Sequence, residues 1–116
     1  MVASTRSHPP ETLSRATALI EEKDGLGITI GEIAESAGVS PRALQLTFRR
    51  HLGVTPTGYM RQVRITHAHR ELEEAAPGDG VTVTRIALDW GFANPSRFAA
   101  YYRSAYGHAP HETLQG

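Results

Sequence analysis

The stretch TIGEIAESAGVSPRALQLTFRRHL, from Thr29 to Leu52, constrains the fold most, because two short helical patterns are separated in it by one glycine. Ile33, Ala34 and Ala37 recur at three- and four-residue steps, which is the spacing of one helix face. Gly38 follows directly, and glycine adopts the left-handed conformation that commonly ends a helix without steric cost. The pattern predicts a first helix that stops at this glycine.

A second helix is predicted to begin almost at once. Ser40 can cap the free amides of a first turn, and Pro41 suits the first helical position. Leu44, Phe48 and Leu52 then recur at steps of four and predict an inner face. Two short helices joined by a tight turn form a helix-turn-helix, whose second helix can enter the major groove of DNA.

The same unit returns in the second half of the chain. The spacing of the first helix and its glycine is repeated at Val83, Ile86, Ala87, Gly91 and Phe92. After a one-residue insertion at Ala93–Asn94, the spacing of the second helix is repeated at Phe98, Tyr102, Arg103, Tyr106, Gly107 and Pro110. Asn94-Pro95 keeps the order of a capping residue followed by proline. This self-similarity predicts a second helix-turn-helix.

The remaining segments are expected to frame these two units. A disordered tail over residues 1–8 leads through two prolines into a helix from about Glu11 to Lys23. Thr55 and Pro56 begin a long bridging helix to about Ala75, and residues 76–80 form a breaker cluster. No period-two pattern predicts a strand. We expect an all-α fold of about seven helices, with a first unit and bridging helix over 9–75 and a second unit over 76–116.

Composition and charge narrow the class of protein. The chain has no cysteine, so disulfides and thiolate metal sites are excluded. No apolar run approaches the roughly 20 residues of a membrane span, and no signal-peptide core is present, so we expect a cytoplasmic protein without membrane contact. The formal net charge is zero, yet the stretch from Arg42 to Arg70 holds arginines and no acidic residue. Charge segregated in this way can build a basic face that meets phosphate.

The tandem units resemble the DNA-binding domain of AraC/XylS-family transcription regulators. IALDWGFANPSRFAAYYRSAYGHAP, from Ile86 to Pro110, is similar to the family signature: Ile-Ala, Gly-Phe, an aromatic-centred recognition helix, then Gly and Pro. VSPRALQLTFRRHLGVTPTGYMRQVRI, from Val39 to Ile65, fits the first unit and the bridging helix. The resemblance covers about Leu13 to Leu114. One departure is Glu112-Thr113-Leu114, where many relatives have an aromatic residue followed by arginine.

The resemblance implies sequence-specific binding of double-stranded promoter DNA by a transcription regulator. The recognition helices, about 41–52 and 95–106, would lie in successive major-groove segments. Family members usually carry this domain after a ligand-sensing, dimerising domain, so a missing N-terminal domain and RNA polymerase are the further partners it suggests. The alternative is a protein-interaction module that contacts RNA polymerase with weak or lost DNA binding. No phosphate loop, nucleophile elbow or acid pair is present, so neither an enzyme nor a cofactor is expected.

Outward positions on the two recognition helices are the candidate base readers. Periodicity turns Leu44 and Phe48 inward, and the N-terminal half of such a helix meets base edges. With the resemblance, this gives Arg42, Gln45 and Leu46 in the first helix and Ser96, Arg97 and Ala100 in the second. Arginine can make two hydrogen bonds to guanine, and glutamine two to adenine. The alternatives are ordinary solvated helix residues and, for Arg97, a phosphate contact.

Other side chains suit the phosphate backbone or the core. Exposed arginines and the threonines at helix N-termini are candidates for phosphate contacts, namely Thr29, Arg49, Arg50, Thr55, Arg61, Thr82 and Arg103. Arg64 and Arg70 could equally pair with glutamates of their own helix. The histidines lack a ligand set, so no metal site is expected. The aromatic residues of the second unit could stack on single-stranded nucleic acid, but their helical spacing favours the core; they are Trp90, Phe92, Tyr101, Tyr102 and Tyr106.

Overall fold

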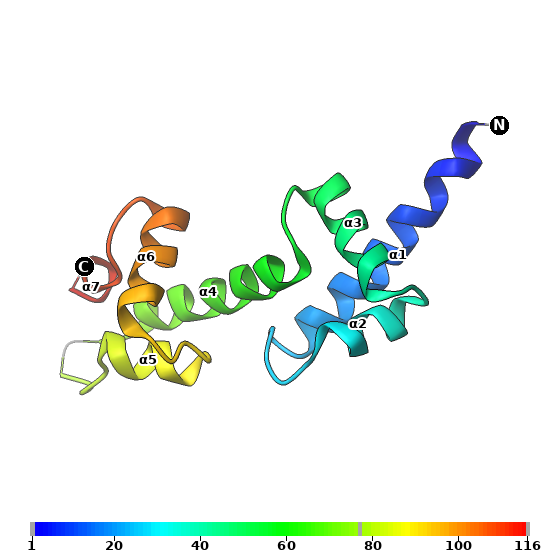
Figure 1. Cartoon of the computed structure of the whole chain (residues 1–116). Helices are drawn as coiled ribbons and strands as arrows, with labels where there is room; N and C mark the ends of the chain where they lie inside the picture. Colours follow the sequence, from blue (N-terminus) through cyan, green and yellow to red (C-terminus); the bar gives the residue numbers. More distant parts are fainter. Residues whose placement is uncertain (1, 77, 116) are drawn as a thin grey trace. The chain divides into compact units, whose positions relative to one another are not determined.

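The computed structural model describes residues 2–76 and 78–115, and within these ranges the chain forms helices and no strand (Figure 1). The helices are α1 (Val2–Glu22), α2 (Ile30–Ala37), α3 (Pro41–Leu52), α4 (Pro56–Glu74), α5 (Val83–Asp89), α6 (Pro95–Tyr106) and α7 (Pro110–Gln115). The all-α fold and the number of helices predicted from the sequence are confirmed. None of the helices described is long and apolar enough to cross a membrane.

Capping side chains set the start of α2. Thr29 Oγ1 accepts a hydrogen bond from the amide of Glu32 at 3.1 Å, and the Glu32 carboxylate accepts one from the amide of Thr29 at 2.9 Å. This reciprocal pair satisfies two amides that the first helical turn leaves without a partner. Gly38, with φ of 74°, ends the helix in the left-handed region, where a side chain would be strained.

Both recognition helices begin with the predicted cap and proline. The Ser40 hydroxyl accepts from the amide of Ala43 at 3.1 Å, and the side-chain oxygen Oδ1 of Asn94 accepts from the amide of Arg97 at 3.0 Å. Pro41 and Pro95 occupy the first turn, where the missing amide hydrogen costs nothing. The two helices therefore start by the same local chemistry.

The chain divides into two packing units, one up to Val63 and one from Arg64 onward. The sequence predicts a boundary after residue 75 at the breaker cluster, and the packing instead divides α4 itself. The reason is that Ile65, Ala68 and Leu72, in the C-terminal part of α4, are buried in the core of the second unit. The breaker cluster ends the helix but does not separate the cores; Pro77 within it lies outside the described residues.

The first unit is built on a core from α1, α2 and α3. Its buried side chains are Ala16, Ile20, Ile33, Ala34, Ala37, Leu44 and Phe48. The ring of Phe48 meets Tyr59 of α4 edge-on, with centroids 5.7 Å apart. The spacing of the sequence predicts that Leu52 lines the same face, and this prediction is wrong, because 42% of the residue is exposed. It is the last residue of α3, where the chain leaves the core at Gly53.

The second unit repeats this arrangement with α5 and α6 against the C-terminal part of α4. Phe98 and Tyr102, at the positions of Leu44 and Phe48, are fully buried. Phe92 packs at 5.0 Å from Phe98 between ring centroids. The repeat read from the sequence is thus a repeat of core positions.

The N-terminal end of α1 differs from the prediction. Helix α1 begins at Val2, whereas a tail over residues 1–8 and a helix from about Glu11 were expected; Met1 lies outside the described residues. Nothing in residues 2–8 breaks a helix, since glycine and proline are absent there. Pro9 and Pro10 provide no amide hydrogens to the preceding turn, which weakens this end of the helix. Disorder of the tail in solution stays a prediction.

The Tyr59 hydroxyl gives a test of the packing of α4 on α1. It donates a hydrogen bond to Glu21 Oε2 at 2.5 Å. Burial, together with the hydrogen bond to the Glu21 carboxylate and its negative charge, raises the pKa of Tyr59 to about 12. Because the folded pKa lies above the unfolded value of about 10, its contribution to stability is complete below pH ~10 and is lost as pH rises through ~12.

We therefore expect wild type to lose stability relative to Tyr59→Phe between pH 10 and 12, in urea unfolding curves measured across that range. The variant has no phenol to ionise at this position, and both proteins share all other titrating groups. Glu21→Gln should lower the pH at which phenolate absorbance develops. Parallel pH profiles for wild type and Tyr59→Phe would contradict the account.

Candidate nucleic-acid interface

The outward face of α3 carries the side chains predicted to read bases. Arg42, Gln45 and Leu46 are exposed. Leu44 and Phe48, on the opposite side of the helix, are fully buried. Leu46 is the most exposed large apolar residue among those described, at 54%. The structure thus brings the three predicted residues to one solvent-facing side of the same helix.

Leu46 also borders a shallow cavity of about 220 Å³ on α3, lined by Ala43, Leu46, Thr47, Arg50 and His51. Its walls combine apolar surface with an arginine and a histidine. An exposed leucine beside an arginine suits this interface, because the leucine can contact a thymine methyl group while the arginine reaches a phosphate at the groove edge.

The outward face of α6 is similar but poorer in polar groups. Ser96, Arg97 and Ala100 are exposed, and Phe98 and Tyr102 are fully buried. Arg97 offers five N–H donors, whereas Ala100 offers none. Of the three, Arg97 has the greatest capacity for hydrogen bonds to a base edge.

The residues predicted to contact phosphates fall into two groups. Arg49, Arg50 and Arg103 are exposed, and so are Thr29 and Thr82, whose hydroxyl oxygens already cap α2 and α5. A capping hydroxyl keeps its own proton to donate to a phosphate oxygen.

Thr55 and Arg61 are half-buried and less available. The Thr55 hydroxyl accepts from the amide of Gly58 at 3.0 Å, and Arg61 takes part in a contact within the protein. Their predicted phosphate contacts are therefore the least supported.

Arg64 has a role that the sequence did not reveal. Its Nη1 donates to the carbonyl oxygens of Trp90 at 3.2 Å and Gly91 at 3.4 Å, and its guanidinium lies 4.5 Å from the centroid of the Phe92 ring. These three residues are the first part of the connection between α5 and α6. The sequence offered an ion pair with glutamates of α4 or a phosphate contact, since neither periodicity nor charge identifies backbone carbonyls as partners.

The aromatic residues of the second unit belong to its core rather than to a stacking platform. Phe92 and Tyr102 are buried, and Trp90, Tyr101 and Tyr106 are half-buried against them. The Trp90 ring stacks on His67 at 4.7 Å between centroids. Among the residues whose side chains are described, no group of three histidine or acidic side chains could hold a metal ion.

Comparison with known proteins places this geometry in a family. A family described as a helix-turn-helix domain matches residues 33–116. The XylDLEGF operon transcriptional activator of Pseudomonas putida is 38% identical over 105 residues, covering 90% of this chain and 32% of that protein. A probable thc operon regulatory protein of Rhodococcus erythropolis is also 38% identical, over 88 residues. The chain thus spans about a third of the length of the first of these relatives.

Solved structures show the same fold. A probable AraC family transcriptional regulator from Rhodopseudomonas palustris matches with a TM-score of 0.82 and 36% identity, over 90% of this chain and 94% of that one. A transcriptional regulator with an AraC-type DNA-binding domain from Chromobacterium violaceum matches with a TM-score of 0.78 and 27% identity, over 90% and 89%.

Replacement of Arg64 tests its role in the turn. Arg64→Met removes the donor that two carbonyl groups share, and we expect the free energy of unfolding to fall by about 1–3 kcal/mol. Urea unfolding of the whole chain measures this loss. Arg70→Met, an exposed arginine of the same helix, serves as a control and should change stability by less than about 0.5 kcal/mol.

Arg64→Lys separates geometry from charge. A lysine ammonium keeps the charge but loses the planar fork and the contact with the Phe92 ring, so it should recover only part of the loss. Full recovery with lysine would show that charge alone matters at this position.

Proposed function

The chain belongs to the AraC/XylS family of helix-turn-helix transcription regulators, and we propose that it inserts α3 and α6 into successive segments of the major groove of promoter DNA. It is a DNA-binding domain, not an enzyme. The observation that carries the proposal is the matched pair of recognition helices, each with two buried side chains on one side and an exposed arginine in its first turn. Successive segments on one face of B-DNA lie about 34 Å apart.

In the first segment, Arg42 is proposed to bond guanine O6 and N7, and Gln45 to bond adenine N6 and N7. Leu46 would contact a thymine methyl group, in keeping with its exposure and with the cavity beside it. The three residues share one exposed helix face, so they can address neighbouring base pairs.

In the second segment, Arg97 is proposed as the principal base reader. Ser96 can donate or accept one hydrogen bond, and Ala100 can make only apolar contact. We therefore propose that the second segment is read less stringently than the first. The exposed arginines and helix-capping threonines would then hold the phosphates, with Arg49, Arg50, Arg103, Thr29 and Thr82 ahead of the half-buried Thr55 and Arg61.

The longer relatives suggest further partners. Because the chain spans 32% of the length of the Pseudomonas putida activator, we propose that this DNA-binding domain works together with an N-terminal sensing and dimerising domain. A regulator of this kind would contact RNA polymerase at the promoter and act in the cytoplasm, where that DNA is accessible.

Selection of bound sites from a random DNA library, followed by substitution of Arg42 and Arg97, tests the proposed function. Arg42→Ala and Arg97→Ala should each cost about 1–3 kcal/mol on the selected site and relax base preference at different positions. Arg15→Ala on α1, whose side chain pairs with Glu11, removes one charge outside the two helix pairs α2–α3 and α5–α6 and should leave base preference unchanged.

An equal loss on selected and random DNA would assign these arginines to the phosphate backbone instead. Recovery of no preferred sequence by the wild-type chain would contradict sequence-specific binding altogether.

The proposed phosphate contacts predict a salt dependence. The logarithm of the binding constant should fall linearly with the logarithm of salt concentration, because each neutralised phosphate releases bound counterions. Arg50→Ala should reduce the slope by about 1 while leaving base preference intact. An unchanged slope would place Arg50 away from the backbone.

A further inference from the structure

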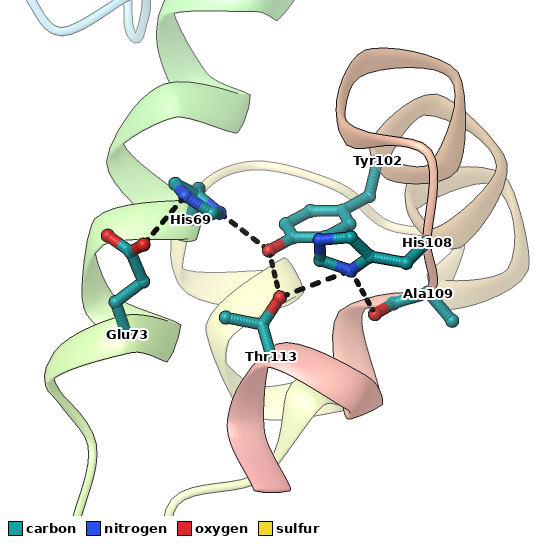
Figure 2. A network of polar contacts seen from close by, with 6 residues as sticks. All are labelled: His69, Glu73, Tyr102, His108, Ala109 and Thr113. Atoms are coloured by element: carbon teal, nitrogen blue, oxygen red, sulfur yellow. Dashed lines mark hydrogen bonds and ion pairs between the residues drawn. The ribbon is translucent and has the colours of Figure 1, made fainter. Parts of the chain in front are cut away.

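The Tyr102 hydroxyl lies at the centre of a polar chain that joins three helices of the second unit (Figure 2). It is 2.6 Å from Nδ1 of His69 on α4 and 2.6 Å from Oγ1 of Thr113 on α7. Tyr102 itself belongs to the recognition helix α6 and is fully buried. One buried atom of the recognition helix is therefore held from two sides.

Both neighbours of the hydroxyl are held in turn. His69 Nε2 lies 3.1 Å from Oε2 of Glu73, and the His69 ring stacks on Tyr106 with centroids 3.9 Å apart. On the other side of the hydroxyl, Thr113 Oγ1 lies 3.5 Å from Nδ1 of His108 (Figure 2). His69 thus contacts α6 at two positions one turn apart, which restrains rotation as well as translation of the helix.

Every hydrogen bond around the Tyr102 hydroxyl can have one donor and one acceptor. A hydroxyl group has one proton and two lone pairs, so Tyr102 can donate to one neighbour and accept from the other. Burial raises the pKa of Tyr102 above its ordinary value, which keeps the proton on the hydroxyl group. A buried hydroxyl that lost one partner would incur the cost of an unsatisfied polar group, so the geometry is strongly favoured.

In the first unit, the recognition helix α3 is held without such a row of hydrogen-bonded side chains. Phe48 occupies the position of Tyr102 in the repeat and has no hydroxyl group. Tyr59 stands three residues after Pro56, as Thr113 stands three residues after Pro110, and it meets Phe48 edge-on. An apolar aromatic contact in the first unit is thus replaced by a directional hydrogen bond in the second.

We propose that His69 and Thr113 are positioning residues that orient α6 through the Tyr102 hydroxyl and thereby set how selectively Arg97 reads its base. Arg97 is exposed on α6 while Tyr102 is buried, so a change in the rotation of the helix at Tyr102 moves the arginine relative to the groove. The departure of Glu112-Thr113-Leu114 from the pattern of many relatives then has a function, because Thr113 supplies one end of the restraint. This inference rests on the proposed function of Arg97.

Tyr102→Phe and Thr113→Val test the inference, because each removes one hydroxyl group and keeps nearly the same volume. Affinity is measured on two DNA sites. The first is the selected site. The second, called the replaced site, differs from it only at the base pairs where Arg97→Ala relaxes the base preference. Each variant should weaken binding to the selected site by about 3- to 10-fold, as expected for one lost hydrogen bond, and should hardly change binding to the replaced site. Thr113→Val keeps the test available should Tyr102→Phe fold poorly.

A double-mutant cycle with Arg97→Ala separates positioning from general destabilisation. If the hydroxyl acts through Arg97, Tyr102→Phe should have almost no effect on binding in the Arg97→Ala background. Thr113→Ser and His69→Asn each keep a hydrogen-bonding group near the original atom, so both variants should retain most of the selectivity of the wild type. Tyr59→Phe, which removes one hydroxyl group from the first unit, should leave selectivity at the bases read by Arg97 unchanged.

An equal loss on the selected and the replaced site, or an undiminished loss in the Arg97→Ala background, would overturn the inference. Folded variants that bind as wild type would overturn it too. Failure of the proposed function is distinct from these results, since the wild-type chain would then show no base preference for Arg97→Ala to relax.

Discussion

Burial of two side chains one turn apart on each recognition helix is the constraint on which the rest of the structure depends. Leu44 and Phe48 anchor α3, and Phe98 and Tyr102 anchor α6; all four are fully buried. Deletion of a side chain of this size from a core costs about 2–5 kcal/mol, so rotation of either helix about its axis is strongly opposed. The opposite face of each helix is thereby committed to solvent, and with it the arginines that can meet DNA.

Much of this was predictable because it rests on local chemistry. The cap at Thr29 and the left-handed Gly38 are decided within a few residues, and the repeat of apolar positions identified both cores. Exposure of Arg42 and Arg97 followed from the same periodicity, although their contacts with DNA stay predictions. Leu52 shows the limit of the pattern: a position in phase with the core does not reach it when the helix ends there.

What could not be predicted depends on contacts between distant residues. The bonds of Arg64 to the carbonyl groups of Trp90 and Gly91 form only once α4 lies against the turn, and nothing in composition or period encodes that approach. The division of α4 between two cores was hidden for a related reason, because the apolar pattern runs through the helix without a break. The two units share a plan, but each is completed by different polar contacts.

We propose above all that both recognition helices of one chain read the major groove. DNase I footprinting on a selected site tests this most directly. Two recognition helices in successive segments predict protection over about two turns of DNA, with two centres about one turn apart. Arg97→Ala should weaken protection around one centre more than around the other. Protection confined to a single turn would mean that only one unit reads the groove and would contradict the account.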